Sequence, residues 1–81
     1  MPMVVMGLSL PDEAVAEARV AIAGDFMLDD VRGTLSAALI SRDFDFGPLN
    51  KDKVVDRAAD RILQKAKRDG LATYQGGRWS A

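Results

Sequence analysis

Two residue types that often carry chemistry are missing from this sequence. It contains no cysteine, which excludes disulfides and thiolate sites and fits a reducing cytoplasm. It also contains no histidine, which removes the commonest general base and the commonest metal ligand. A Ser/His/Asp set, a phosphate-binding loop and metal-ligand spacing are absent as well. We therefore expect a cytoplasmic protein that is not an enzyme and holds no cofactor.

Long apolar runs are also missing. The apolar start, MPMVVMGLSL, is far shorter than the ~20 residues of a membrane span, and it lacks the basic start and cleavage site of a signal peptide. We expect residues 1–10 to form an apolar arm that packs on its own domain, contacts a second copy in a homodimer, or stays loose. Residues 11–81 suffice for a single domain, and no membrane contact is expected.

Charge is distributed unevenly along the chain, although the net charge is only −1. Residues 1–49 carry three arginines and eight acids, whereas residues 50–81 carry eight basic residues and four acids. The first part therefore has a net charge of −5 and the second a net charge of +4. A basic face on an acidic body suits a polyanion, an acidic protein or head-to-tail pairing between copies. The acidic pI of about 5.2 weighs against nucleic acid.

The basic part begins with a predicted helix over residues 51–69. Seven apolar residues recur at helical spacing, while Arg57, Arg61 and Lys65 repeat every four positions on another face. The apolar residues are Val54, Val55, Ala58, Ala59, Ile62, Leu63 and Ala66. Asn50 is a suitable N-cap, and Gly70 can adopt the left-handed conformation that ends a helix, with Leu71 as its apolar contact.

After Gly70 the apolar period changes from helical to alternating, which predicts a β-hairpin over about residues 71–80. Gly76-Gly77 supplies the two turn residues that tolerate positive φ. A lone hairpin is marginal in water, so it must pack on the domain, and we expect Leu71 with either Tyr74 or Trp79 to make that contact.

This C-terminal stretch, KRDGLATYQGGRWS, resembles the third helix and wing of a winged helix-turn-helix domain. In that superfamily a charged helix end is commonly followed by Gly-Leu, a short strand, a glycine-containing tip and an aromatic strand. The resemblance implies a mainly α fold with a small β-hairpin wing, that is, an α+β three-helix winged helix-turn-helix. It covers the last residues well and the earlier ones only by helix count, and it assigns no particular family.

Two further helices are predicted, over about residues 11–23 and 28–41. Ser9 is the expected cap of the first, with Leu10 in its buried stripe and Gly24 as its stop. The connector before the second helix is where winged helices often place a short strand. Asp25, Asp29 and Asp30 cluster here, but helix caps and dipole-favoured acids explain all three better than a metal site.

The segment from residue 41 to residue 49, SRDFDFGPL, departs from the helix-turn-helix pattern, because that motif usually joins its helices by three or four residues. Phe44 and Phe46 alternate with aspartates. We expect their rings to enter the core while the acids face water, and the alternative is an exposed aromatic contact for a protein partner.

The leading hypothesis is a DNA-binding winged helix that acts as a transcriptional or phage-type regulator on double-stranded DNA. The predicted DNA-binding residues are Lys51, Lys53, Arg57, Arg61, Gln64, Lys65, Arg68, Gln75 and Arg78. The alternative is a winged-helix adaptor or inhibitor that binds an acidic protein and not DNA. Its predicted contacts are Phe44, Phe46, Val4 and Val5. A third interpretation of the basic residues is a solvated helix face neutralised by Asp56 and Asp60.

Overall fold

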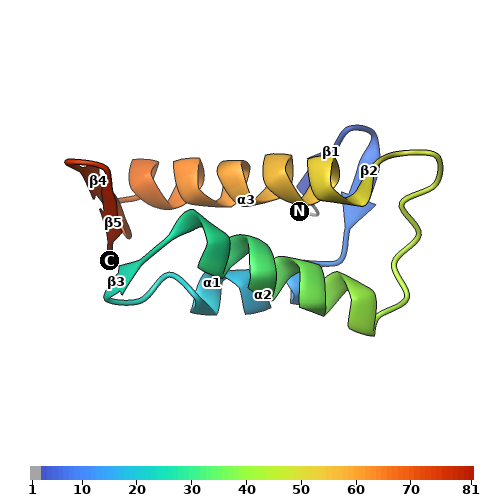
Figure 1. The fold of residues 1–81 in the computed structure, drawn as a ribbon, viewed down its shortest axis with the longest axis horizontal. Helices are drawn as coiled ribbons and strands as arrows, with labels where there is room; N and C mark the ends of the chain where they lie inside the picture. Colours follow the sequence, from blue (N-terminus) through green and yellow to red (C-terminus); the bar gives the residue numbers. More distant parts are fainter. Residues whose placement is uncertain (1–2) are drawn as a thin grey trace.

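The computed structural model describes residues 3–81, which form three helices and two small antiparallel sheets (Figure 1). The helices are α1, α2 and α3, and the strands are β1 to β5. Helix α3 lies along one side of the molecule, while α1 and α2 lie along the other. The predicted α+β class is confirmed.

The N-terminal residues form a hairpin that the sequence analysis did not predict. Strand β1, Met3–Val5, pairs with β2, Leu8–Leu10, around a turn in which Met6 and Gly7 both have positive φ. Val5 and Leu10 are each only 1% exposed and belong to the main core. Residues 3–10 are therefore an integral layer of this domain.

Helix α1 spans Asp12–Val20 and is shorter at both ends than predicted. The predicted cap, Ser9, lies in β2, where strand pairing keeps the backbone extended, and Pro11 takes the cap position instead. At the other end, the N–H groups of Ala21 and Ile22 bond three residues back rather than four, which tightens and ends the helix before Gly24.

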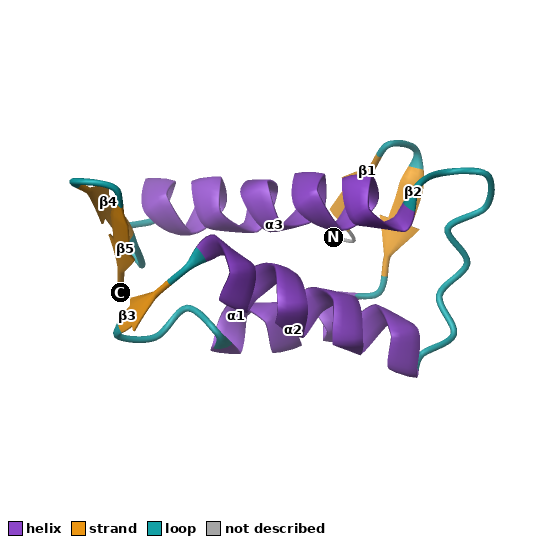
Figure 2. Ribbon diagram, viewed as in Figure 1, coloured by secondary structure: helices purple, strands orange, loops and turns teal. Residues whose placement is uncertain are grey.

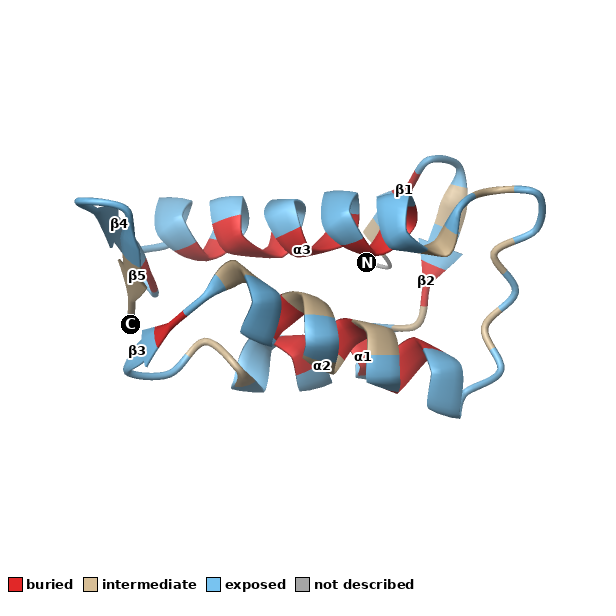
Figure 3. Ribbon diagram, viewed as in Figure 1, coloured by how far each residue is buried: buried red, intermediate tan, exposed pale blue. Residues whose placement is uncertain are grey.

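Helices α2, Leu28–Ser41, and α3, Lys51–Arg68, agree closely with the prediction. In Figure 1 they run in opposite directions along the long axis. All seven predicted apolar residues of α3 are buried, and Figure 3 shows that this buried stripe faces α1 and α2. The core contains no buried polar or charged side chain among the described residues, so it is held by apolar contact alone.

The second sheet closes one end of the molecule (Figure 2). Its order is β3-β5-β4, in which β3 is Asp25–Phe26, β4 is Thr73–Gln75 and β5 is Arg78–Ser80. The Gly76-Gly77 turn was predicted correctly, and both glycines have positive φ. Phe26 opposes Trp79 across β3 and β5, and their ring centroids are 5.9 Å apart.

The predicted contact through Leu71 is wrong. Leu71 is 64% exposed, whereas its neighbour Ala72 is buried. Successive side chains in extended chain point to opposite sides, so the burial of Ala72 turns Leu71 outward. The hairpin is anchored to the core by Ala72 and by Trp79, which is partly buried against it.

The connection between α2 and α3 spans residues 42–50. Phe44 and Phe46 meet edge to face with centroids 5.0 Å apart, and both are partly buried against the core. The long connection thus carries its own apolar contact, which packs it against the core.

Candidate nucleic-acid interface

Helix α3 is firmly defined at both ends. The Asn50 side-chain oxygen accepts hydrogen bonds from the backbone N–H groups of Asp52, at 2.9 Å, and Lys53, at 3.2 Å, so the predicted N-cap is confirmed. At the C-terminus, Leu71 N–H donates to the Ala66 carbonyl at 2.8 Å and Gly70 N–H to the Lys67 carbonyl at 3.2 Å. This pair of bonds is a Schellman motif, so α3 is a rigid rod about 27 Å long.

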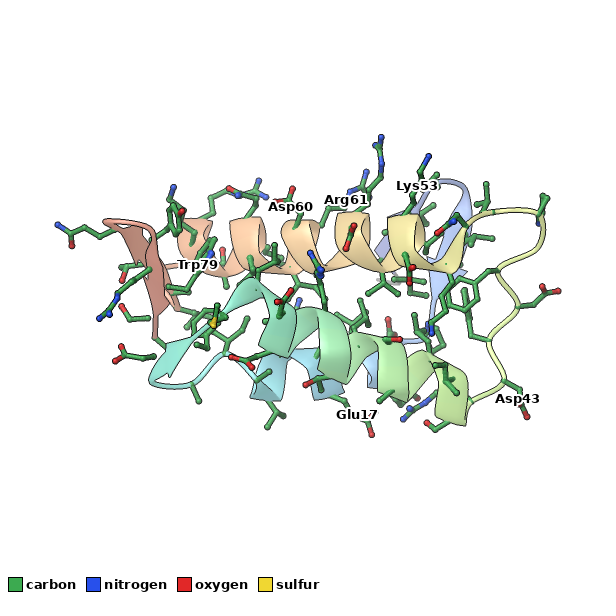
Figure 4. The ribbon with its side chains drawn as sticks, viewed as in Figure 1. Glu17, Asp43, Lys53, Asp60, Arg61 and Trp79 are labelled. Atoms are coloured by element: carbon green, nitrogen blue, oxygen red, sulfur yellow. The ribbon has the colours of Figure 1, made fainter. Side chains whose placement is uncertain are left out.

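Six exposed side chains form the outer face of α3, opposite its buried stripe. They are Lys53, Arg57, Asp60, Gln64, Lys67 and Arg68, spaced at intervals that keep them on one side of a helix. Figure 4 shows Lys53 and Asp60 on the side of α3 that faces away from α1 and α2. The outer face therefore offers four cations and one amide to a ligand, with one carboxylate among them.

The other three predicted residues of α3 lie elsewhere. Lys51 precedes the buried Val54 and Val55 by three and four residues, so it shares their side of the helix and is itself only half-exposed. Arg61 and Lys65 lie on the flank towards β1 and α1. The Arg61 guanidinium donates a hydrogen bond to the backbone carbonyl of Val4 in β1.

The two predicted wing residues, Gln75 and Arg78, oppose each other across the β4–β5 hairpin, next to its Gly-Gly tip. Both are exposed. Figure 1 shows this hairpin at the C-terminal end of α3, far from Lys53 at the start of the helix. The predicted site is therefore not one compact cluster but a strip that follows the long axis of the molecule, which is 36 Å long.

The ion pairs separate Arg32 of α2, and Arg42 directly after α2, from the arginines of the predicted site. Among residues 3–81 there are three ion pairs, and every one involves Arg32 or Arg42. Arg32 bridges Asp29 at 3.1 Å and Asp56 at 3.2 Å, and Arg42 pairs with Glu17 at 2.9 Å. Asp56 is thus bound on the α2 side and does not neutralise the outer face of α3.

Sequence analysis missed Arg19, which the fold brings beside the basic flank of α3. Arg19 lies in the last turn of α1 and lines a groove together with Arg61, Lys65 and Arg68. The sequence held one sign that Arg19 belongs to a surface with other residues of α1. One face of this helix carries Asp12, Val15, Ala16 and Arg19. The sequence did not reveal that this face meets α3.

The four residues of the alternative protein-binding site are also scattered. Val5 is in the core and therefore cannot contact a partner while the hairpin is intact. Val4 points outward and is 49% exposed. Phe44 and Phe46 are partly buried against their own core, at the opposite end of the molecule from the wing.

Comparisons with known proteins found no matching family model, no similar curated protein and no similar solved structure. Within residues 3–81, no helix combines the length and the apolar character needed to cross a bilayer. The same residues contain no group of three or more carboxylates arranged to hold a metal ion.

Proposed function

We propose that this protein is a winged-helix domain that binds double-stranded DNA through α3 and the β4–β5 hairpin. The observation that carries the proposal is the pairing of β3 with β5. Strand β3 lies between α1 and α2 in the chain, yet it joins the hairpin that follows α3 in one sheet of order β3-β5-β4. Helix order, sheet order and the glycine tip all agree with the winged-helix resemblance of the C-terminal sequence.

The long connection between α2 and α3 changes how such a domain would meet DNA. With nine residues between them, α2 and α3 pack side by side and run in opposite directions, unlike the tight helix-turn-helix pair. Helix α3 is therefore the only helix on its side of the molecule, and the β4–β5 hairpin lies at its C-terminal end. The long axis of the molecule, 36 Å, is close to one turn of B-DNA, about 34 Å, so a domain lying along the duplex spans about one helical turn.

The uneven distribution of charge supports DNA as the ligand of the α3 side. It also explains how the pI can be low, because the acidic residues lie mainly elsewhere in the chain. Lys53, Arg57 and Arg68 project from α3 without a carboxylate partner among the described residues, and Gln64 between them has the donor and acceptor needed for an adenine edge. The acidic residues are concentrated in the first half of the chain. Those on α2 repel phosphate from the α2 side, which favours a single orientation on the duplex.

The test is an amide-shift titration with a random-sequence duplex, run at low salt and again near physiological salt. We expect shifts on α3 and on the hairpin tip that weaken steeply with salt, because released counterions drive such binding. A flat response at low salt would overturn the proposal.

A matched pair of double variants identifies the face. Lys53→Gln with Arg57→Gln should weaken duplex binding roughly tenfold and lower the salt slope by about 2, since each phosphate contact contributes about 1. Arg32→Gln with Arg42→Gln removes the same charge from α2 and the residue directly after it, and should change binding little. Equal losses in both variants would mean that only net charge matters, and the assignment to α3 would be wrong.

A protein-binding adaptor is the second candidate, and exposed apolar side chains favour it. Val20 on α1 is 78% exposed and Met27 before α2 is 66% exposed. Such side chains suit a protein partner better than a phosphate backbone. A folded protein that gives no shifts with DNA would move this candidate into first place.

A further inference from the structure

A groove runs between α1 and α3 along much of their length. It consists of a hollow of about 700 Å³, which starts at Met3 and Val4 of β1, and a second of about 240 Å³, which ends at Leu71. The two hollows share Arg19 and Lys65 as lining residues, so they lie next to each other between α1 and α3. Helix α1 supplies one wall and α3 supplies the other. Arg19 and Lys65 lie where the two hollows meet.

The groove is rich in cations from two separate elements. Arg19 comes from α1, and Arg61, Lys65 and Arg68 come from α3, against three carboxylates: Asp12 and Asp60 in the larger hollow and Asp69 in the smaller one. None of the four cations forms an ion pair within residues 3–81, whereas Arg32 of α2 and Arg42, directly after α2, both do. Their charge is therefore available to an external anion.

The position of Arg61 is set by the protein itself. Its guanidinium donates to the Val4 carbonyl, which uses one of its five N–H donors and leaves the others for a ligand. A side chain held in this way loses less conformational entropy when it binds an anion. The β1–β2 hairpin therefore positions a cation at one end of the groove.

The two flanks of α3 differ in charge. The flank towards α1 carries Arg61 and Lys65, whereas the flank towards α2 carries Asp56, which is bound to Arg32. A duplex that receives the outer face of α3 places a phosphate strand beside each flank. The DNA strand beside the α1 flank is attracted by cations, whereas the strand beside the α2 flank meets a carboxylate. The protein therefore binds the two strands with unequal strength.

We infer that the groove between α1 and α3 binds the phosphate groups of one DNA strand, with Arg19 as a phosphate ligand contributed by α1. The inference deepens the proposed function and rests on it for duplex DNA as the source of the phosphates. Guanidinium groups pair with phosphate oxygens through two parallel N–H donors, so arginine suits this position better than lysine. The DNA contact surface then extends from α3 across the groove to α1.

The test is Arg19→Gln, measured by duplex titration at several salt concentrations. We expect affinity to fall about three- to tenfold for every duplex sequence, with the salt slope lowered by about 1, because a phosphate contact carries no sequence information. Arg42→Gln is the matched control and should leave both quantities unchanged. Arg19→Lys keeps the charge and should restore the slope but only part of the affinity.

Arg19 is exposed, and circular dichroism will show whether its variants remain folded. Lys65→Gln is the second variant for the same groove and should lower the salt slope equally.

A parallel titration with inorganic phosphate alone distinguishes duplex DNA from a small phosphorylated ligand as the source of the phosphate. Saturable shifts at Arg19 and Lys65 with phosphate, combined with an unchanged duplex slope in Arg19→Gln, would overturn the strand assignment in favour of a small phosphorylated ligand.

The outcomes also separate this inference from the proposed function. If the wild-type protein gives no response to duplex, both fail. If Lys53→Gln with Arg57→Gln weakens binding while Arg19→Gln behaves as wild type, DNA binding stands and only the groove is rejected.

Discussion

Replacing glycine by alanine is expected to have opposite effects at two positions of this domain. Gly33 lies inside α2 with ordinary helical φ, and a Cβ built there meets nothing within 4 Å. Gly33→Ala therefore adds no clash and removes conformational freedom from the unfolded chain. We expect it to raise the free energy of unfolding by about 0.5–1 kcal/mol.

Gly70 has equally open space around a built Cβ, but its φ is +77° because it closes the Schellman motif of α3. An L-residue in that conformation costs about 1–2 kcal/mol. Gly70→Ala should therefore lower the free energy of unfolding by that amount. The two variants differ by one methyl group each, yet their stabilities should lie about 1.5–3 kcal/mol apart, which is the sum of the two effects.

Urea unfolding followed by circular dichroism at the helix band measures both values, and thermal scans provide a check. A change of 1 kcal/mol corresponds to roughly 4–8 °C in Tm for a domain of this size. If Gly33→Ala destabilises the protein, the open space around Gly33 in α2 is wrong. A neutral Gly70→Ala would refute the left-handed end of α3.

Three further changes test the fold. Asn50→Ala removes the cap of α3 and should cost about 1 kcal/mol in urea unfolding, whereas an unchanged midpoint would contradict the two cap hydrogen bonds. Leu35→Ala, at a fully buried site, should cost about 2–5 kcal/mol, while Leu71→Ala should cost less than about 0.5; similar losses would mean that Leu71 is core after all. Arg32→Gln breaks two half-exposed ion pairs and should cost less than about 1 kcal/mol, and a larger loss would show a stronger network.

The sequence was most informative about α3, because several local signals agreed there. The apolar stripe, the Asn50 cap and the Gly70 end each act within one or two turns, and the structure has all of them. The Gly76-Gly77 turn was equally predictable, since two adjacent glycines favour the positive φ of a two-residue hairpin turn.

The N-terminal hairpin was missed because its turn lacks the usual residues. Met6 adopts φ of +52° beside Gly7, and methionine is not a residue from which such a turn is predicted. Both strands are also almost wholly apolar, so only Ser9 marks the outward side. Missing the hairpin led to the incorrect cap at Ser9 and left open whether Val5 contacts its own domain or a protein partner.

The candidate site was only partly predictable for a different reason. The sequence analysis grouped Arg57 with Arg61 and Lys65 on one face of the helix, whereas the structure places Arg57 on the outer face of α3 and the other two on the flank towards α1. Spacing within one helix says nothing about which other element packs beside it. The convergence of Arg19 with Lys65 depends on how α1 meets α3, which is a tertiary property of the chain.

The aromatic contacts of the second sheet give the protein an internal optical probe. Trp79 is the only tryptophan, and it lies between Phe26, at 5.9 Å, and Tyr74, at 4.9 Å between ring centroids. Its emission reports whether the last strand is docked on β3, while circular dichroism reports the three helices. Coincident transitions would show that sheet and helices melt as one unit, and an earlier fluorescence change would show that the hairpin detaches first.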